Sequence, residues 1–344
     1  MVVNARAMRW GLVGLLVGAS LALAADAGAQ IPAKPEVEAA IKAAHAKYLG
    51  LKEGKNADYI PALAKVPSGL FGIAVVTVDG QVYTVGDVAQ LFSIQSISKV
   101  FTMAEVMQES GEQQVEDSVG VDATGAVFNS IEAIEKYKGH EMNAFVNPGA
   151  IATTSMVKGA NADAIWAKII GIHSDFAGRP LEVNQEVYKS ESDTNQRNQA
   201  IGMLMYAYRL IKENPGQATD LYTRQCSINV NAKDLATMAA TLANGGTNPV
   251  TKKKVIDSKH VSGVLAVMAT AGLYDDSGKW LFHTGLPAKS GVGGGLIAVS
   301  PGKFGIAAFS PPLDAAGNSV RAQKAIADVS QALGGNQYDA KPPR

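Results

Sequence analysis

The sequence predicts a mixed α/β fold: one antiparallel sheet built from both ends of the chain, with a block of helices inserted between its halves. Strand patterns occupy 71–85 and return at 296–309, around the tight turns Asp79-Gly80 and Pro301-Gly302. Helical periodicity dominates from 111 to 244. A cleft between sheet and helices is the natural place for a site.

Two amphipathic helices are expected to flank the sheet. Pro35–Leu49 has apolar residues at helical spacing, and so has Asn318–Leu333 near the other end. The sheet parts are therefore predicted at about 35–95 and 280–335, and the helical part at about 96–279, within one domain of residues 30–344. The clearest helices of the middle part are Ala160–Gly171, Gln196–Glu213 and Asn231–Leu242, the last closed by Asn244-Gly245-Gly246.

Residues 1–29 have the composition of a secretory signal peptide. Arg6 and Arg9 precede an apolar run at 10–24 that is short for a membrane span. Ala22-Leu23-Ala24 and Ala27-Gly28-Ala29 are both acceptable cleavage sites. We expect an exported, periplasmic protein with no other membrane segment.

Charge and composition exclude several classes of function. The chain has 344 residues with 31 basic and 31 acidic side chains, so no net field favours nucleic acid. Cys226 is the only cysteine; it excludes an intramolecular disulfide and is expected to be a small buried residue. We expect no cofactor and no metal, because the histidines lack ligand spacing. They are His45, His140, His173, His260 and His283.

Ser96-x-x-Lys99 is the first chemical signal. A serine hydroxyl needs a base within hydrogen-bond reach to act as a nucleophile. A helix that starts near Ser96 and stops at Gly111 sets Lys99 on the same face. Burial of Lys99 lowers its pKa and frees a lone pair to take the serine proton.

Lys289-Ser290-Gly291 is the second signal. Serine β-lactamases and penicillin-binding proteins combine S-x-x-K with a later K-T-G, and here K-S-G falls on the first strand after the helices. The glycines at 291 and 293–295 are expected to let this strand approach a ligand closely. A backbone N–H of this strand and that of Ser96 are candidates for an oxyanion hole.

Further motifs extend over 35–330, and together with Phe92–Phe101 they resemble the serine-dependent glutaminase family. The resemblance implies a β-lactamase/DD-peptidase-like fold and hydrolysis of L-glutamine to L-glutamate and ammonia through an acyl-serine, in a homodimer or homotetramer. The motifs are Ala57–Pro61, Phe128–Ile131, Asn143–Ile151, Ser190-Glu191 with Arg197-Asn198, Tyr222–Ile228, Gly272–Gly278, Gly285–Gly294 and Ser310–Leu313.

The resemblance also implies roles for single residues. Ser96 corresponds to the nucleophile and Lys99 to its base, with Tyr222 and Tyr274 assisting proton transfer and holding the substrate. The N–H groups of Ser96 and Val292 correspond to the oxyanion hole. The glutamine-binding positions correspond to Tyr59, Gln95, Asn147, Glu191 and Asn198. Glu191 suits the α-ammonium, and the amides and tyrosine hydroxyls suit the α-carboxylate.

One departure from the family is Pro148, where alanine is usual. Proline is expected to restrict Asn147 to extended conformations and to remove a backbone donor, with an effect on affinity for glutamine.

Two other functions stay open. A serine β-lactamase or penicillin-binding peptidase shares both motifs, with Ser227-x-Asn229 as its middle motif. The other is a non-catalytic glutamine-binding protein. Asparagine is expected to be a poor substrate, because its shorter side chain misplaces the carbonyl.

Overall fold

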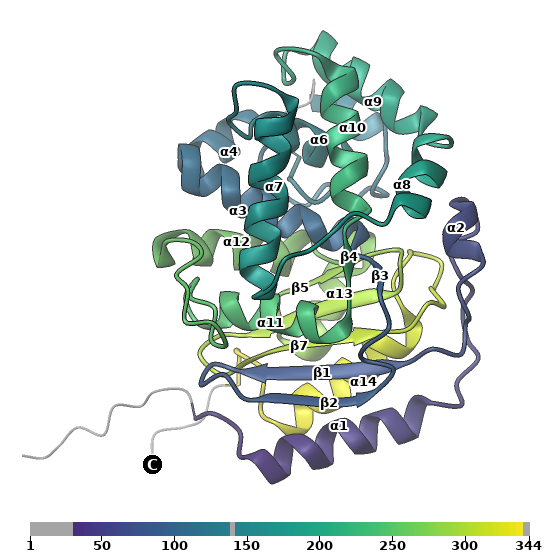
Figure 1. Cartoon of the computed structure of the whole chain (residues 1–344), viewed down its shortest axis with the longest axis vertical. Helices are drawn as coiled ribbons and strands as arrows, with labels where there is room; N and C mark the ends of the chain where they lie inside the picture. The colour runs from purple at the N-terminus through teal and green to yellow at the C-terminus, as the bar shows by residue number, and fades with distance from the viewer. Residues whose placement is uncertain (1–29, 138–141, 340–344) are drawn as a thin grey trace, which may run out of the picture.

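A five-stranded antiparallel sheet in the order β2-β1-β7-β6-β5 is the base of the structure (Figure 1). The computed structural model describes residues 30–137 and 142–339. β1 pairs with β7 from Gly72↔Phe309 to Thr77↔Phe304, so both ends of the chain meet in the sheet, as predicted. The strands are β1 (Gly72–Thr77), β2 (Val82–Gly86), β5 (Ala288–Ser290), β6 (Gly295–Ser300) and β7 (Phe304–Phe309).

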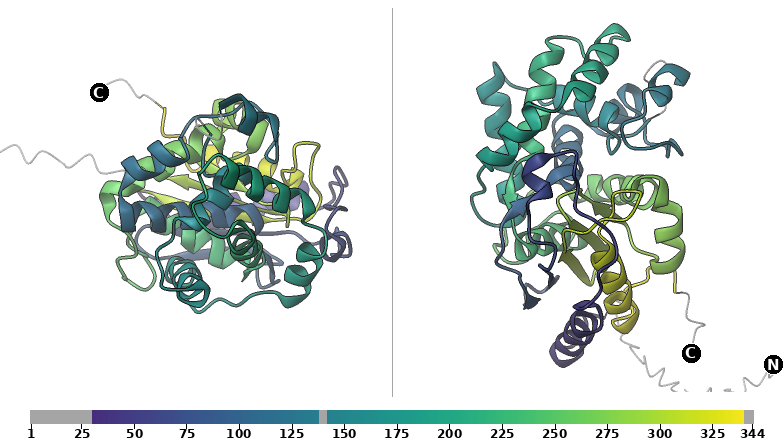
Figure 2. Two further views of the ribbon diagram at one scale, coloured as in Figure 1. Left: turned by 90° about the horizontal axis from the view of Figure 1, so that it is seen from above. Right: turned by 90° about the vertical axis from the view of Figure 1, so that its right-hand side faces the viewer.

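Helices cover both faces of the sheet. Ile306 and Ala308 belong to the core on the side of α1 (Lys34–Tyr48) and α14 (Val320–Ala332), which lie side by side (Figure 2). Ala307 and Phe309, the alternate residues of β7, belong to the core on the other face of the sheet, where α11 (Ala232–Ala243) packs against β7. The continuous burial of both faces explains why the strands read as apolar runs.

The inserted helices form a second part with a core of its own. Ile151, Ile201 and Met205 are among the fully buried side chains of this core. The helices of this part lie above the sheet in Figure 1. Its core is built by α5 (Glu132–Tyr137), α6 (Asn147–Ser155), α9 (Gln196–Ala207) and α10 (Pro215–Cys226). The other helices of this part are α3 (Ser98–Ser110), α4 (Glu112–Ser118) and α7 (Ala162–Ala177), whose buried residues join the core against the sheet, and α8 (Gln185–Ser192).

Some predicted boundaries were wrong. The helix expected over 196–213 ends at Ala207, because Arg209 adopts φ 63° and a new helix begins at Pro215. α7 continues to Ala177, where Gly178 in the left-handed conformation stops it. α11 lies on the sheet, and α12 (Val261–Ala271) and α13 (Ser277–Thr284) also pack into the sheet cores. The segment predicted as helical thus contributes to both parts.

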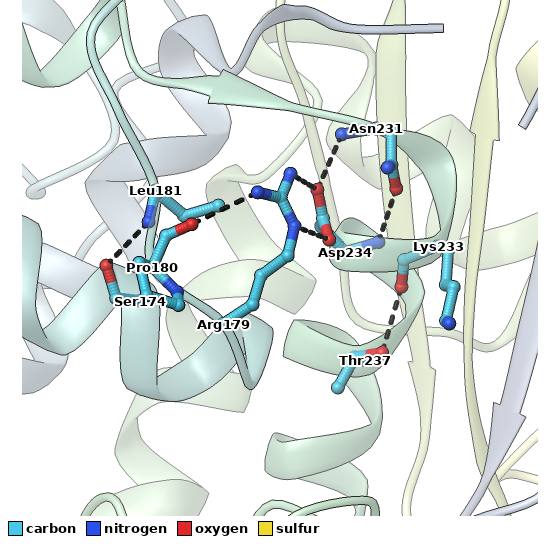
Figure 3. Close-up of polar contacts among 8 residues, drawn as sticks. All are labelled: Ser174, Arg179, Pro180, Leu181, Asn231, Lys233, Asp234 and Thr237. Atoms are coloured by element: carbon cyan, nitrogen blue, oxygen red, sulfur yellow. Dashed lines mark hydrogen bonds and ion pairs between the residues drawn. The ribbon is translucent and has the colours of Figure 1, made fainter. Parts of the chain in front are cut away.

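An ion pair joins the helical part to the sheet layer (Figure 3). Arg179, just after α7, donates from Nε and Nη2 to the two carboxylate oxygens of Asp234, at 2.8 and 2.6 Å. Asp234 also exchanges hydrogen bonds with Asn231 in a capping box at the start of α11. This contact fixes the end of α7 against the first turn of α11.

The signal peptide predicted at 1–29 lies outside the described residues. Within 30–137 and 142–339, no helix has both the length and the apolar character that crossing a membrane requires.

Candidate active site

Ser96 lies in a strained turn between the short strand β3 (Phe92–Ser93) and α3. The turn is a single 3₁₀ helix over Gln95–Ile97, and Gln95 adopts φ 51°, a left-handed conformation that is unfavourable for a residue with a side chain. Ser96 is buried but borders a cavity. The helix predicted to start near Ser96 begins at Ser98 and ends before Gly111.

Glycines in the turn between β5 and β6, a segment predicted as strand, make room for the Ser96 turn. A Cβ atom on Gly291 would lie 2.7 Å from the carbonyl oxygen of Ile94, and one on Gly293 would lie 2.5 Å from that of Ser93. The segment was expected to approach a ligand; at these two glycines it approaches the backbone that leads into Ser96. Their absent side chains bring the two halves of the site together.

Lys99 is a buried amine directly behind the nucleophile turn. Its Nζ donates to Asn147 Oδ1 at 2.7 Å and to the Phe145 carbonyl at 3.1 Å. The Tyr222 hydroxyl donates to the same Asn147 oxygen at 3.1 Å. Burial lowers the pKa of Lys99 to about 8. A lysine in this state supplies a useful fraction of free amine near neutral pH.

Lys289 is a second buried amine that sequence reasoning did not select as a site residue. It is fully buried, its Nζ donates to the Ser290 carbonyl at 2.8 Å, and it lies 4.3 Å from the ring centre of Tyr274. Burial and the nearby Lys99 lower its pKa well below the usual value. The K-S-G motif was the signal that pointed to it.

Tyr274 links Lys289 to the nucleophile. Its hydroxyl donates to the Ser290 carbonyl at 3.5 Å. Burial raises the pKa of Tyr274 to about 12, and the neighbouring Ser96 and Ser290 act in the opposite direction. The backbone of Tyr274 adopts φ 57°. Burial raises the pKa of Tyr222 well above 10, so both phenols are proton donors at neutral pH.

Two backbone amides face the cavity without an acceptor. Within the described residues, no hydrogen bond engages the N–H of Ser96 or that of Val292. Both residues line the cavity. Their amides are therefore available to an oxyanion.

The cavity has a volume of about 290 Å³ and one acidic wall residue, Glu191. Glu191 is buried and accepts from Gln95 Nε2 at 3.3 Å. Burial raises its pKa to about 7, although Gln95 and Lys99 act in the opposite direction. Asn147 Nδ2 donates to Asn198 Oδ1 at 3.0 Å.

The structure brings the predicted site residues together. Lys99 and Tyr274 lie behind the cavity wall, and Tyr59, about half exposed, lies at the rim. The predicted residues that line the cavity are Tyr59, Gln95, Ser96, Asn147, Glu191, Asn198, Tyr222 and Val292. Sequence reasoning did not assign a role to four other polar lining residues, Asn129, Thr194, Asn195 and Arg197.

The prediction for Pro148 was wrong in its geometry. Asn147 is not extended; it is the first residue of α6, and Pro148 is the second. The first N–H groups of a helix have no acceptor within it, so proline is tolerated there and its fixed φ suits the helix.

Metal ligands do not gather in the described part of the chain. No group of three or more His, Cys, Asp or Glu side chains has a suitable arrangement there. His283 is exposed on α13, and Cys226 is buried as expected. His140 lies outside the described residues.

An antiparallel sheet built from both ends of the chain, with helices inserted between its halves, defines a hydrolase with the β-lactamase-like fold. A profile of the glutaminase family matches residues 54–338. The chain belongs to the glutaminase family.

Relatives and solved structures agree with this assignment. A glutaminase of Colwellia psychrerythraea is 53% identical over 310 residues, which span 90% of this chain and all of the relative. The solved structure of a probable glutaminase, ybaS, has a TM-score of 0.88 at 46% identity and covers 90% of this chain and all of that one. The structure of Mglu in its glutamate form has a TM-score of 0.83 at 34% identity, over 87% of this chain and 69% of that one.

Proposed function

We propose that the protein hydrolyses L-glutamine to L-glutamate and ammonia through an ester on Ser96. The observation that carries this proposal is the Ser96 turn backed by the buried Lys99, in a cavity whose acidic wall residue is Glu191. The cavity is at the small end of the range for small-molecule sites. This size fits a free amino acid.

In the first half of the reaction, Ser96 Oγ attacks the side-chain carbonyl carbon of glutamine. The neutral amine of Lys99 takes the serine proton, directly or through the Tyr274 hydroxyl beside Ser96. The carbonyl oxygen gains negative charge and is stabilised by the N–H groups of Ser96 and Val292. The same proton then passes to the departing nitrogen, so that ammonia leaves and a glutamyl ester remains.

In the second half, water attacks the ester. Lys99 takes a proton from the water, the tetrahedral intermediate collapses, and the proton returns to Ser96 Oγ as glutamate leaves. Tyr222 and Lys99 share Asn147 as an acceptor, so this asparagine holds both groups in place. No net proton is consumed by the enzyme over the cycle.

Substrate binding is proposed to use the charge of Glu191. A carboxyl with a pKa of about 7 in the empty cavity becomes fully ionised when the α-ammonium of glutamine arrives beside it. Gln95 holds this carboxylate, and Asn198 offers its amide to the substrate.

The test is ammonia release by purified protein lacking residues 1–29. We expect turnover of L-glutamine, at least a hundredfold lower kcat/KM with L-asparagine, and no opening of a chromogenic β-lactam. Ser96→Ala should abolish turnover. Hydrolysis of the β-lactam without turnover of glutamine would overturn the proposal, and so would comparable rates on both amino acid amides.

We also propose that the protein is exported to the periplasm and forms a homodimer or homotetramer. The first rests on the composition of residues 1–29 and the second on the family resemblance. Cell fractionation and the intact mass of the mature protein test export, with cleavage expected after Ala24 or Ala29. Sedimentation velocity tests assembly. A cytoplasmic protein that keeps Met1, or a monomer at micromolar concentration, would contradict the respective proposal.

A further inference from the structure

The two amides that face the cavity belong to peptide groups whose carbonyls point the other way. The N–H of Ser96 shares its peptide group with the carbonyl of Gln95. The N–H of Val292 shares its peptide group with the carbonyl of Gly291. Both peptide groups are trans and planar, so a hydrogen bond that holds the carbonyl also fixes the direction of the N–H.

The Val292 peptide group is held by backbone alone. The carbonyl of Gly291 accepts from the N–H of Gly294 at 3.0 Å, within the turn between β5 and β6. This turn therefore sets the direction of the Val292 amide without a side chain.

The Ser96 peptide group is held by a side chain as well as by backbone. The carbonyl of Gln95 accepts from the backbone N–H of Ser98 in the 3₁₀ turn, and also from the Ser98 hydroxyl at 2.7 Å. Gln95 has φ 51°, a conformation that persists only where the surrounding contacts hold it. The Ser98 hydroxyl is one of these contacts.

Gln225 of α10 sets the direction in which the Ser98 hydroxyl donates. A carbonyl oxygen only accepts, so the single hydroxyl proton of Ser98 lies on its bond to Gln95, and Ser98 Oγ must accept from Gln225 Nε2 at 3.1 Å. The amide oxygen of Gln225 then faces the hydroxyls of Thr102, at 2.7 Å, and Thr154, at 3.3 Å. All these side chains are buried.

We propose that Gln225 and Ser98 are positioning residues that orient the Ser96 amide toward the oxyanion. A chain of hydrogen bonds runs from Thr102 through these two side chains to the carbonyl of Gln95, on the opposite side of the peptide group from the cavity. The inference rests on the proposed function and adds two residues that do not line the cavity. Because the oxyanion forms only in the transition state, their loss lowers kcat and leaves KM nearly unchanged.

Steady-state kinetics of ammonia release from L-glutamine test this inference. Ser98→Ala removes the side-chain donor to the Gln95 carbonyl. Gln225→Met keeps the length of the side chain and removes the donor that orients the Ser98 hydroxyl. The third variant combines both changes. Thr241→Val is the control: it removes a buried hydroxyl on α11 that donates to a backbone carbonyl outside the cavity wall.

We expect Ser98→Ala to lower kcat by roughly 10- to 50-fold, less than the loss of an oxyanion donor itself, with KM within threefold. Gln225→Met should lower kcat by about fivefold or more in wild type, but by less than twofold in Ser98→Ala, because both residues act through one bond. Thr241→Val should lower the midpoint of urea unfolding and leave kcat within twofold.

A kcat of Ser98→Ala within twofold of wild type would overturn the inference. So would an effect of Gln225→Met that is the same with and without the Ser98 hydroxyl. If urea unfolding shows that Ser98→Ala does not fold, Ser98→Cys, whose thiol is a weak donor, replaces it in both comparisons with the same expected direction. Failure of the wild type to release ammonia from L-glutamine is a different result, which would overturn the proposed function itself.

Discussion

Replacement of Lys99 by methionine should separate stability from activity in a way that depends on pH. Lys99 is a buried amine whose pKa falls from 10.5 to about 8 because its charged form is poorly solvated. Methionine has a similar length and no charge. The substitution therefore removes both the base and the cost of keeping an ammonium in the interior.

The magnitude follows from the pKa. A fall from 10.5 to about 8 corresponds to about 3 kcal/mol at roughly 1.4 kcal/mol per pKa unit. Between these two values the unfolded chain binds the lysine proton and the folded protein does not, so stability rises with pH across this window. Below pH 8 the folded protein bears the full penalty, and above pH 10.5 it bears none.

Urea unfolding followed by tryptophan fluorescence measures this effect. The free energy of unfolding of wild type minus that of Lys99→Met should increase by about 3 kcal/mol from pH 7.5 to pH 10.5. Other titrating groups largely cancel in the difference. In parallel, wild-type kcat/KM should rise by up to about tenfold between pH 7 and pH 8 and level off above, while the variant loses about a thousandfold. A difference in stability that is flat or falls with pH would refute the reasoning.

Three further substitutions test other parts of the site and fold. Below pH 7 the wild-type KM should rise by up to about tenfold per pH unit, because Glu191 takes up a proton. Glu191→Gln should have a high KM that does not change with pH. Initial rates measured from pH 5.5 to 8 test both expectations, and a KM of the variant that still rises below pH 7 would contradict them. Pro148→Ala should keep KM within a factor of two and lower the free energy of unfolding by less than about 1 kcal/mol, because the helix start already suits proline; a large drop in KM would contradict this. Asp234→Ala should lower the free energy of unfolding by about 2 kcal/mol in urea titrations, through loss of the Arg179 pair and the α11 cap, without altering KM; an unchanged midpoint would contradict this.

The sheet was predictable because its signals are local. Apolar runs on either side of the turns Asp79-Gly80 and Pro301-Gly302 indicate two hairpins, and each hairpin can be recognised from a short stretch of sequence. That the two ends of the chain share one sheet followed from the fold class. The pairing of β1 with β7 is a finding of the structure. The Ser96-x-x-Lys99 signal was equally local, although the α-helix expected to carry both residues begins only at Ser98.

What the sequence did not reveal depends on contacts between distant segments. Gly291 and Gly293 have no room for a side chain, because the backbone of Ser93 and Ile94 passes against them. These contacts join segments about two hundred residues apart in the chain. α9 ends just before Arg209, which adopts a left-handed conformation although it is not a glycine, so no signal in the sequence marks this end. Tertiary packing decides such positions, and local pattern does not.

The same limit applies to the charged groups of the site. The K-S-G motif marked Lys289, but its complete burial against the Tyr274 ring is a property of the assembled core. Arg197 is one of eight arginines in the sequence, and only the folded chain shows that it lines the same cavity as Glu191.

Rapid-quench mass spectrometry of the protein mixed with L-glutamine tests the central claim, that Ser96 carries the acyl group, most directly. Acid quench within the first turnover should give a fraction of protein heavier by one glutamyl group, and proteolysis should place it on the peptide that contains Ser96. Ser96→Ala should give no such species and no ammonia. Ammonia release that persists in Ser96→Ala, or a glutamyl group on another residue, would contradict the account.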